Sequence, residues 1–197
     1  MKKLFAMLTV VLMIAPLAWG QNEWGLFAAY WDTDDADDAL GVGIKVAVEI
    51  IPVVQLEIRG AYFEDFEAGS NLAKADVEVI PLEVGLILTV PIDNALEGFV
   101  GGGIGYYFMD GDVDLPTGTR IDAGPDDEIG GYVTAGLKLP VWKSGASFGE
   151  TQAVLFGDIT YRFVDAEDIH VESGPEVTLN DADLNGVGFN AGLLVRW

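Results

Sequence analysis

The side chains best suited to chemistry lie near the carboxyl end of this chain. His170 is the one histidine in the sequence, and Glu172 and Ser173 follow it closely. A serine activated by a histidine, which a carboxylate in turn orients, is the nucleophilic arrangement of many hydrolases. Ser173 begins a Ser-Gly-Pro stretch, however, and such a stretch is typical of a turn. We therefore expect no enzymatic activity, and a membrane lipid hydrolase is kept only as an alternative.

The same region contains a pattern of oxygen donors that suits calcium. Asp181, Asp183, Asn185 and Gly186 have the spacing of positions 1, 3, 5 and 6 of an EF-hand loop. The twelfth position of such a loop is a bidentate glutamate, whereas here it is Gly192. Asp181, Asp183 and Asn185 are thus candidate Ca²⁺ ligands, and the alternative is a turn at Asn185 in an acidic loop. The sequence indicates no other cofactor.

These candidate residues lie in the last of several gaps between segments of alternating polarity. The segments span 22–31, 40–50, 53–63, 76–90, 97–108, 129–140, 151–163 and 187–197. Apolar residues recur at every second position within them, which is the period of a β-strand. The gaps alternate between long and short, so antiparallel strands would bring every long gap to one end. The sequence therefore predicts an all-β fold, an eight-stranded antiparallel up-and-down transmembrane β-barrel.

The charges divide between the long gaps and one face of the strands. The chain carries 10 basic and 32 acidic residues, a net charge of −22. Gaps 32–39, 64–75, 109–128 and 164–186 hold most of the acid, so we expect four acidic, solvated loops on the outside of the cell. Such a charge argues against binding to nucleic acid, which requires lysine and arginine. It favours loose bridging by divalent ions to anionic lipopolysaccharide.

On the strands, charged side chains share one face and nearly balance in sign. An unpaired buried charge costs several kcal/mol, so this balance is what a closed polar lumen requires. The predicted lumen network comprises Lys45, Glu49, Glu57, Arg59, Glu83, Lys138, Asp158, Arg162 and Arg196. Eight strands leave an interior that side chains can fill, so we expect a plugged bore. A narrow pore or conduit for small or hydrophobic solutes is the alternative.

Aromatic residues concentrate at the strand ends. Two rings of aromatic side chains at the two membrane–water interfaces are typical of outer-membrane barrels. The predicted girdle residues are Trp24, Tyr30, Trp31, Tyr62, Tyr106, Tyr107, Tyr132, Tyr161 and Trp197. Gly101, Gly103 and Gly105 fall on the inner face of one strand, where they would make room for long side chains of neighbouring strands.

The first 20 residues read as an export signal. Lys2 and Lys3 precede an apolar stretch, and Ala18-Trp19-Gly20 supplies small residues at a cleavage site. We expect residues 1–20 to be a signal peptide that is cleaved after about Gly20, and residues 21–197 to form one barrel domain. The sequence contains no cysteine, which excludes disulfides, thiol nucleophiles and cysteine-based zinc sites.

Two motifs carry a resemblance to a known family. The segment 98–107 (GFVGGGIGYY) resembles the glycine-rich strand of small outer-membrane barrels of the OmpA transmembrane-domain, OmpX and OmpW type. The pattern Phe189-x-Ala191-x-Leu193-x-Val195-x-Trp197 resembles the carboxyl-terminal signal read by the barrel-assembly machinery, with tryptophan in place of the commoner phenylalanine. The resemblance implies a monomeric barrel in the outer membrane of a Gram-negative cell, with a non-enzymatic structural or surface-interaction role.

Overall fold

The computed structural model describes residues 22–33, 38–70, 73–93, 95–114, 120–122, 127–146, 149–166 and 182–197. The segments of regular structure in these ranges are all strands: β1 (Asn22–Thr33), β2 (Ala39–Ile51), β3 (Val54–Ser70), β4 (Ala73–Pro91), β5 (Glu97–Asp114), β6 (Arg120–Asp122), β7 (Glu128–Ala146), β8 (Gly149–Phe163), β9 (Asp165–Ala166), β10 (Ala182–Asp183) and β11 (Gly186–Arg196). The described part of the chain contains no helix able to cross a membrane. The predicted signal peptide, residues 1–20, lies outside the described residues.

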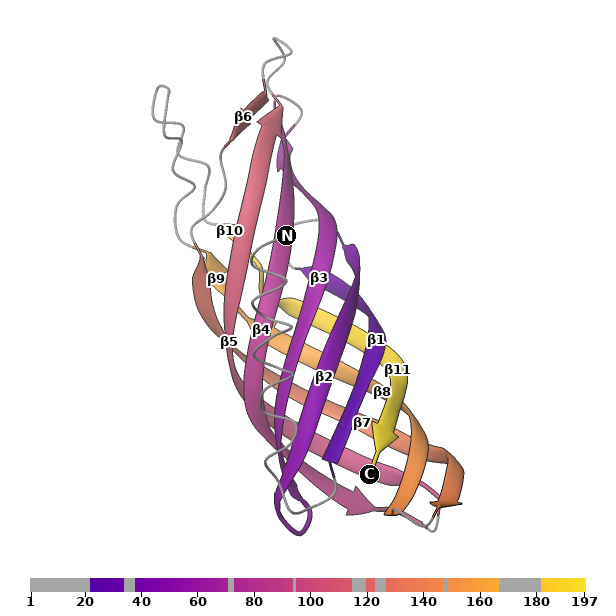
Figure 1. Cartoon of the computed structure of the whole chain (residues 1–197). Coiled ribbons are helices and arrows are strands. Elements are labelled where there is room, and N and C mark those ends of the chain that lie inside the picture. Colours follow the sequence, from indigo (N-terminus) through magenta and orange to yellow (C-terminus); the bar gives the residue numbers. More distant parts are fainter. Residues whose placement is uncertain are drawn as a thin grey trace.

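Eight of the strands form one closed antiparallel barrel (Figure 1). They follow the order β4-β3-β2-β1-β11-β8-β7-β5, and pairing of β4 with β5 completes the ring. The seam between the first and last strands is fully hydrogen-bonded at its end. The Asn22 N–H donates to the Trp197 carbonyl at 3.1 Å, and the Trp197 N–H donates to the Asn22 carbonyl at 3.0 Å. The predicted fold, an eight-stranded antiparallel barrel, is confirmed.

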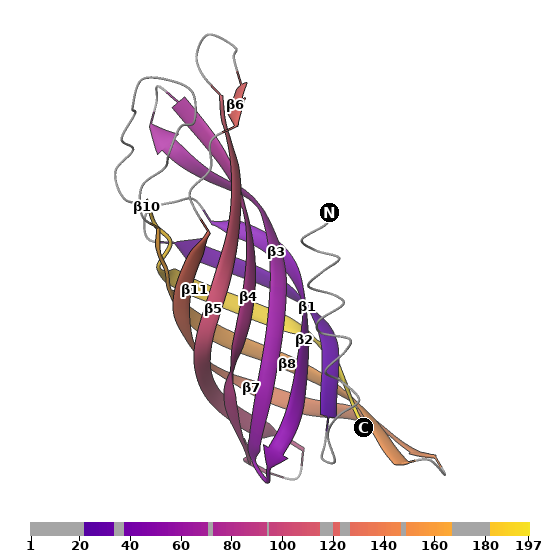
Figure 2. The ribbon, with the colours of Figure 1, turned by 60° about the vertical axis from the view of Figure 1, so that its left-hand side comes forward.

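Several strands run further than the sequence pattern indicated. β3 continues to Ser70 and β4 begins at Ala73, so most of the predicted long loop 64–75 is a paired hairpin. β5 likewise continues to Asp114 and pairs there with the short strand β6. Figure 2 shows β3, β4 and β5 rising beyond the other strands. The predicted boundaries were too short because they followed the alternation of apolar residues, which ends before the backbone pairing does.

The connections give the barrel two unlike ends. We call the end formed by the β2–β3, β4–β5 and β7–β8 connections the short-turn rim, and the opposite end the loop rim. Only Pro52 and Val53 separate β2 from β3, and residues 147–148 separate β7 from β8. Both chain ends of the barrel, Asn22 and Trp197, lie at the short-turn rim.

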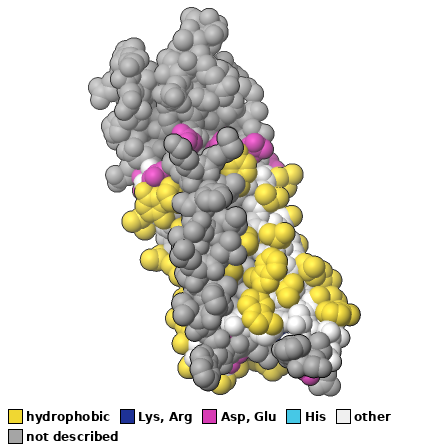
Figure 3. Space-filling view, viewed as in Figure 1, with side chains coloured by type: hydrophobic (Ala, Val, Ile, Leu, Met, Phe, Trp, Pro, Cys, Tyr) yellow, Lys and Arg dark blue, Asp and Glu magenta, His cyan; other side chains and the backbone are white. Residues whose placement is uncertain are grey.

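The polarity of the barrel is inverted relative to a water-soluble protein. Large apolar side chains such as Leu86, Ile104 and Leu193 are about half exposed on the outer wall. Arg59 and Lys138, by contrast, are at most 2 % exposed inside. Figure 3 shows apolar side chains spread over the wall and acidic ones gathered toward the loop rim. Soluble proteins bury apolar residues and almost never fully bury lysine or arginine unless they are paired.

Glycines on β4 and β5 leave space for interior side chains. A Cβ atom at Gly85 would lie 2.4 Å from the Tyr132 hydroxyl, whereas one at Gly103 would lie 2.0 Å from the Val84 carbonyl oxygen, so Gly103 lets the backbones of β4 and β5 approach. A Cβ at Gly105 would come within about 3.0 Å of the side chains of Glu83 and Tyr107. The expectation that inner-face glycines make room for long neighbours agrees with this geometry. Glycine is required here because the Tyr132 side chain reaches across to β4.

Candidate functional site

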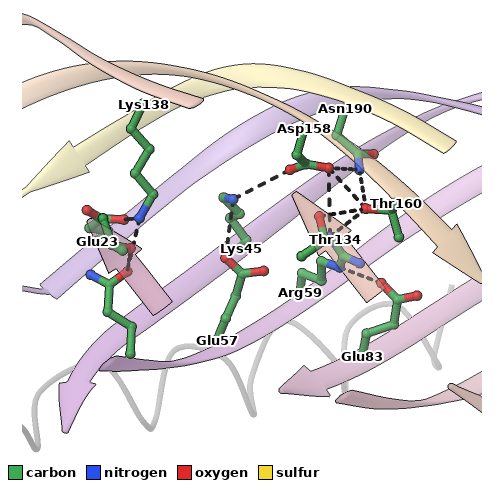
Figure 4. Close-up of polar contacts among 12 residues, drawn as sticks. Glu23, Lys45, Glu57, Arg59, Glu83, Thr134, Lys138, Asp158, Thr160 and Asn190 are labelled. Atoms are coloured by element: carbon green, nitrogen blue, oxygen red, sulfur yellow. Dashed lines mark hydrogen bonds and ion pairs between the residues drawn. The ribbon is translucent and has the colours of Figure 1, made fainter. Parts of the chain in front are cut away.

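The interior of the barrel holds ion pairs in three groups that follow one another along the bore (Figure 4). Each group joins strands that are distant in the sequence, since every strand contributes its inward-facing side chains. The members of the first two groups and Glu23 and Lys138 of the third are almost completely buried. We describe them from the loop rim to the short-turn rim.

The group nearest the loop rim is centred on the carboxylate of Glu83 on β4. Arg59 Nε lies 2.5 Å from Glu83 Oε2, and Arg162 Nε lies 2.9 Å from Oε1. The Tyr107 hydroxyl donates to the same Oε1 at 2.9 Å. One carboxylate therefore compensates two guanidinium groups, and charge-assisted bonds of this kind are stronger than neutral ones.

The middle group is centred on the ammonium of Lys45 on β2. Its Nζ lies 3.2 Å from Glu57 Oε2 and 3.9 Å from Asp158 Oδ2. Asp158 Oδ1 accepts hydrogen bonds from the Asn190 amide at 2.5 Å and the Thr160 hydroxyl at 3.1 Å. The middle group thus has one more negative than positive charge, and the Glu83 group has one more positive than negative charge. The two groups are in contact, since Arg59 Nη1 lies 4.0 Å from Asp158 Oδ1.

The third group lies at the short-turn rim. Lys138 Nζ donates to Glu23 Oε2 at 2.6 Å and to the Gln55 side-chain oxygen at 3.0 Å. Arg196 binds Glu23 Oε1 through Nε at 2.7 Å, and its two terminal nitrogens bind the Glu97 carboxylate at 2.7 and 2.5 Å. The arginine thus bridges a buried carboxylate and a partly exposed one, since the Glu97 side chain is 22 % exposed.

Aromatic side chains separate and cover these ion pairs. Trp31 packs edge-on against Phe63 with ring centres 5.4 Å apart, and the Arg162 guanidinium lies 4.6 Å from the Trp31 ring. Lys45 Nζ lies 3.8 Å from the Phe156 ring centre. Cations over aromatic faces gain electrostatic attraction, more so when desolvated. We call the buried apolar set at the loop rim the apolar cap: Trp31, Phe63, Val79, Tyr107, Met109, Val164 and Leu184.

Most residues of the predicted lumen network do lie together inside the barrel. Eight of them are buried: Lys45, Glu57, Arg59, Glu83, Lys138, Asp158, Arg162 and Arg196. Glu49 is half-buried near the short-turn rim. Sequence reasoning missed Glu23 and Glu97. Glu23 could have been predicted, because Trp24 and Leu26 face outward and Glu23 therefore falls on the inner face of the strand. The other inner-face residues of this strand are mostly apolar, so the strand did not show the polar inner face of its neighbours.

The predicted aromatic girdle is partly wrong. Trp24, Tyr106 and Trp197 are exposed on the outer wall, and Tyr30, Tyr62 and Tyr161 face outward at partial exposure. Trp31, Tyr107 and Tyr132, in contrast, are at most 2 % exposed and face the bore. The physical reason is strand alternation: neighbours such as Tyr106 and Tyr107 cannot both face outward.

The candidate calcium ligands are only partly visible. Asp181 lies outside the described residues, as does the side chain of Asp183. The side-chain oxygen of Asn185 accepts a hydrogen bond from the Val164 N–H at 2.7 Å, which helps to hold the start of β11 against the end of β8. The described residues contain no cluster of three or more metal-binding side chains. His170, Glu172 and Ser173 also lie outside the described residues, so both interpretations stay predictions.

The arrangement of charges is suited to filling the bore. Side chains that lined a continuous water channel would expose part of their surface to it. The members of the first two groups are instead 6 % exposed or less. A closed network of this kind fixes the relative positions of the strands, because each carboxylate needs partners from other strands to offset its desolvation.

Comparison with known proteins supports the fold. No family model and no curated protein matches the sequence. The crystal structure of the outer membrane protein OprG from Pseudomonas aeruginosa is similar with a TM-score of 0.69 at 15% identity, covering 90% of this chain and 96% of that chain. Neisserial surface protein A is similar with a TM-score of 0.59 at 13% identity, with the same coverage.

A third solved structure, the attachment invasion locus protein Ail of Yersinia pestis, gives a TM-score of 0.52 at 12% identity. It covers 90% of this chain and 99% of that chain. The class of protein that this architecture defines is therefore the small eight-stranded antiparallel β-barrel, and the solved structures that share it are outer-membrane proteins. At 12–15% identity, these similarities show a common fold alone.

Proposed function

We propose that this protein is an integral outer-membrane β-barrel with a non-enzymatic role, either structural or in surface interaction. The observation that carries the proposal is the inverted polarity of the barrel. Leu86, Ile104 and Leu193 are exposed on the wall, while Arg59 and Arg162 are buried in ion pairs. An apolar outer band around a polar interior is the arrangement that a bilayer requires of a β-barrel.

The surface-interaction role rests on the loop rim. Outward-facing acidic side chains there, including Glu64, Glu78 and Asp110, are exposed. The extension of β3, β4 and β5 beyond the barrel would carry part of this charge away from the membrane. Dense carboxylates attract counterions, so we propose that the loops contact lipopolysaccharide through divalent ions. Specific Ca²⁺ binding near Asp183 and Asn185 is a narrower form of the same proposal.

The alternatives are less well supported. A pore or conduit needs a continuous lumen, whereas the residues of the Glu83 group are at most 2 % exposed. A hydrolase would depend on His170, and a His170→Ala variant should leave the composition of lipid A unchanged. We expect the barrel to function as a monomer that is inserted by the barrel-assembly machinery through β11.

The test of membrane insertion uses cell fractionation together with gel mobility. A folded barrel resists SDS and migrates differently before and after boiling, so we expect a heat-modifiable band in the outer-membrane fraction. A soluble periplasmic protein without heat-modifiable mobility would contradict the proposal. Replacing residues 167–181 by a two-residue Asn-Gly turn, which can connect the paired Ala166 and Ala182 and spares the buried Val164 and Leu184, should then leave folding intact and reduce surface binding. Unchanged binding would contradict the surface-interaction role.

A further inference from the structure

The turns of the short-turn rim have apolar tips. Ile50, Ile51 and Val53 at the β2–β3 turn and Val90 and Ile92 at the β4–β5 turn are each 49–60 % exposed. Turns that face water are dominated by glycine, asparagine, aspartate and serine, because those residues suit turn geometry and polar surroundings. Exposed apolar groups gathered at one end of a protein indicate an interaction surface.

Val53 gives a second, independent observation. Its φ angle is 72°, and among the described residues it is the one non-glycine with a positive φ. A β-branched residue is strained in this conformation, which glycine or asparagine adopts more easily. The turn is held in place because the Val53 carbonyl accepts a hydrogen bond from the Thr89 N–H at 2.8 Å. The chain thus keeps an apolar side chain at a position where turn geometry favours glycine.

The acidic side chains of the β4–β5 turn are already partnered. Asp93 Oδ1 accepts hydrogen bonds from the backbone N–H groups of Ala95 at 2.7 Å and Leu96 at 2.8 Å. Glu97 is bound in bidentate fashion by Arg196. Asp93 is itself exposed and Glu97 partly exposed, so both carboxylates meet the surrounding medium. Internal partners reduce the cost of placing the carboxylates of Asp93 and Glu97 in a medium less polar than water.

The outer face of β4 continues without interruption into its turn. Its outward residues from Ile80 onward are Ile80, Leu82, Val84, Leu86, Leu88, Val90 and, beyond the strand, Ile92. At about 3.3 Å per residue and a tilt of roughly 40°, this stripe is about 30 Å tall, against an apolar band of about 25 Å in outer-membrane barrels. With the hydrocarbon edge just below Glu78, the stripe passes the opposite edge near Val90. Ile92 would then lie in the headgroup region.

We propose that the short-turn rim is a lipid-binding surface, at which the tips of the β2–β3 and β4–β5 turns insert into the headgroup region of the adjacent leaflet. The proposal rests on the membrane insertion proposed above and goes beyond it. The occupant is phospholipid because the apolar rim is continuous with the apolar wall and the carboxylates of its β4–β5 turn are internally bound. Trp142, exposed at the base of the β7–β8 hairpin, would lie at the same depth.

The test uses single cysteine variants, since the chain contains no cysteine of its own. Val53→Cys and Ile92→Cys report on the rim, Leu86→Cys on the wall and Asp32→Cys on the loop rim. Each is labelled with an environment-sensitive fluorophore and reconstituted at low protein density in phosphatidylcholine vesicles. Quenching by aqueous iodide is then compared with quenching by lipids that carry a spin label.

At Val53 and Ile92 we expect lipid quenching close to that at Leu86, and iodide quenching several-fold weaker than at Asp32. Strong iodide quenching at both rim sites would overturn the proposal. Shielding from both quenchers would also overturn it, because a second copy of the chain would then cover the rim. If the Leu86 label is itself reached by iodide and not by lipid, the proposed membrane insertion fails as well. If the Val53→Cys variant does not fold, the Ile92→Cys variant still tests the proposal.

Discussion

The two ends of the bore use the same ionic groups in different surroundings. At the loop rim, Glu83 binds two arginines and Tyr107, which is also a member of the apolar cap, and these four side chains are at most 2 % exposed. At the short-turn rim, Arg196 is shared between the buried Glu23 and the partly exposed Glu97. Pairing alone therefore does not set how much stability is lost when a charge is removed. What matters is whether water can replace the missing partner.

The largest effect is expected at Glu83. Glu83→Gln keeps the shape of the side chain but removes the carboxylate that Arg162 binds, and it leaves Arg59 with Asp158, 4.0 Å away, in a buried environment. We expect a loss of about 3–5 kcal/mol in the free energy of unfolding, measured by urea titration in detergent micelles. As a control, adding Arg162→Met to Glu83→Gln should recover part of the loss. A wild-type urea midpoint for Glu83→Gln would contradict the lumen assignment.

Glu23→Gln should have an intermediate effect. It leaves Lys138 with the neutral Gln55 oxygen, while Arg196 keeps Glu97 as a partner. We expect a loss of about 2 kcal/mol, because one buried cation loses its counter-charge near the end of the bore. Urea midpoints measured beside those of Glu83→Gln would show it. A loss at Glu23 greater than that at Glu83 would reverse the comparison between the two ends.

Glu97→Gln should have a smaller effect that salt can modify. Water reaches the carboxylate, and Arg196 retains Glu23, so we expect a loss of about 1 kcal/mol or less. The difference from wild type should shrink further in high salt, because exposed ion pairs are screened. The measurement is the urea midpoint at low and high ionic strength. An effect at Glu97 that salt does not change would indicate that this pair is more deeply desolvated than its exposure suggests.

The smallest effect is expected at the Val53 turn, where two contributions of opposite sign nearly cancel. Val53→Gly removes the strain of a positive φ at a β-branched residue. It also removes an apolar contact with the micelle, so we expect a net change within about 1 kcal/mol of zero. Ile92→Gly, which relieves no such strain, is the matched control and should be the less stable of the two. Equal urea midpoints for the two variants would show that the Val53 turn stores no strain.

Much of this architecture was predictable because it follows from strand alternation. The eight strands, the closed ring and eight members of the lumen network follow from which residues share a face. The predicted girdle was wrong where the same type of residue occurs on both the outer and the inner face of a strand. Tyr106 and Tyr107 look alike in the sequence, yet Tyr106 faces outward and Tyr107 donates to Glu83 inside. A strict count of alternate positions would have separated them and would also have placed Trp31 in the interior.

Other features could not have been predicted from a local pattern. The apolar cap brings Trp31, Phe63 and Leu184 together from three distant segments, and only the barrel register decides that they meet. The hairpin between β3 and β4 beyond Phe63 depends on a register shift in β3 between Phe63 and Phe66, and no sequence motif predicts this shift. Arg196 can bind both Glu23 and Glu97 only because β11 pairs with β1 and closes the barrel, which places Arg196 opposite Glu23.

The hydrogen bonds between Asn22 and Trp197 have a consequence for how the molecule is made. Because the ring is closed by its first and last strands, all other hairpins can form before closure, but the cylinder stays open along one edge until β11 arrives. Such a contact has the greatest sequence separation in the fold, and contacts of this kind form slowly. The same proximity means that a short linker could join these two ends and new termini could be cut elsewhere. A circular permutant would then retain every pair of neighbouring strands.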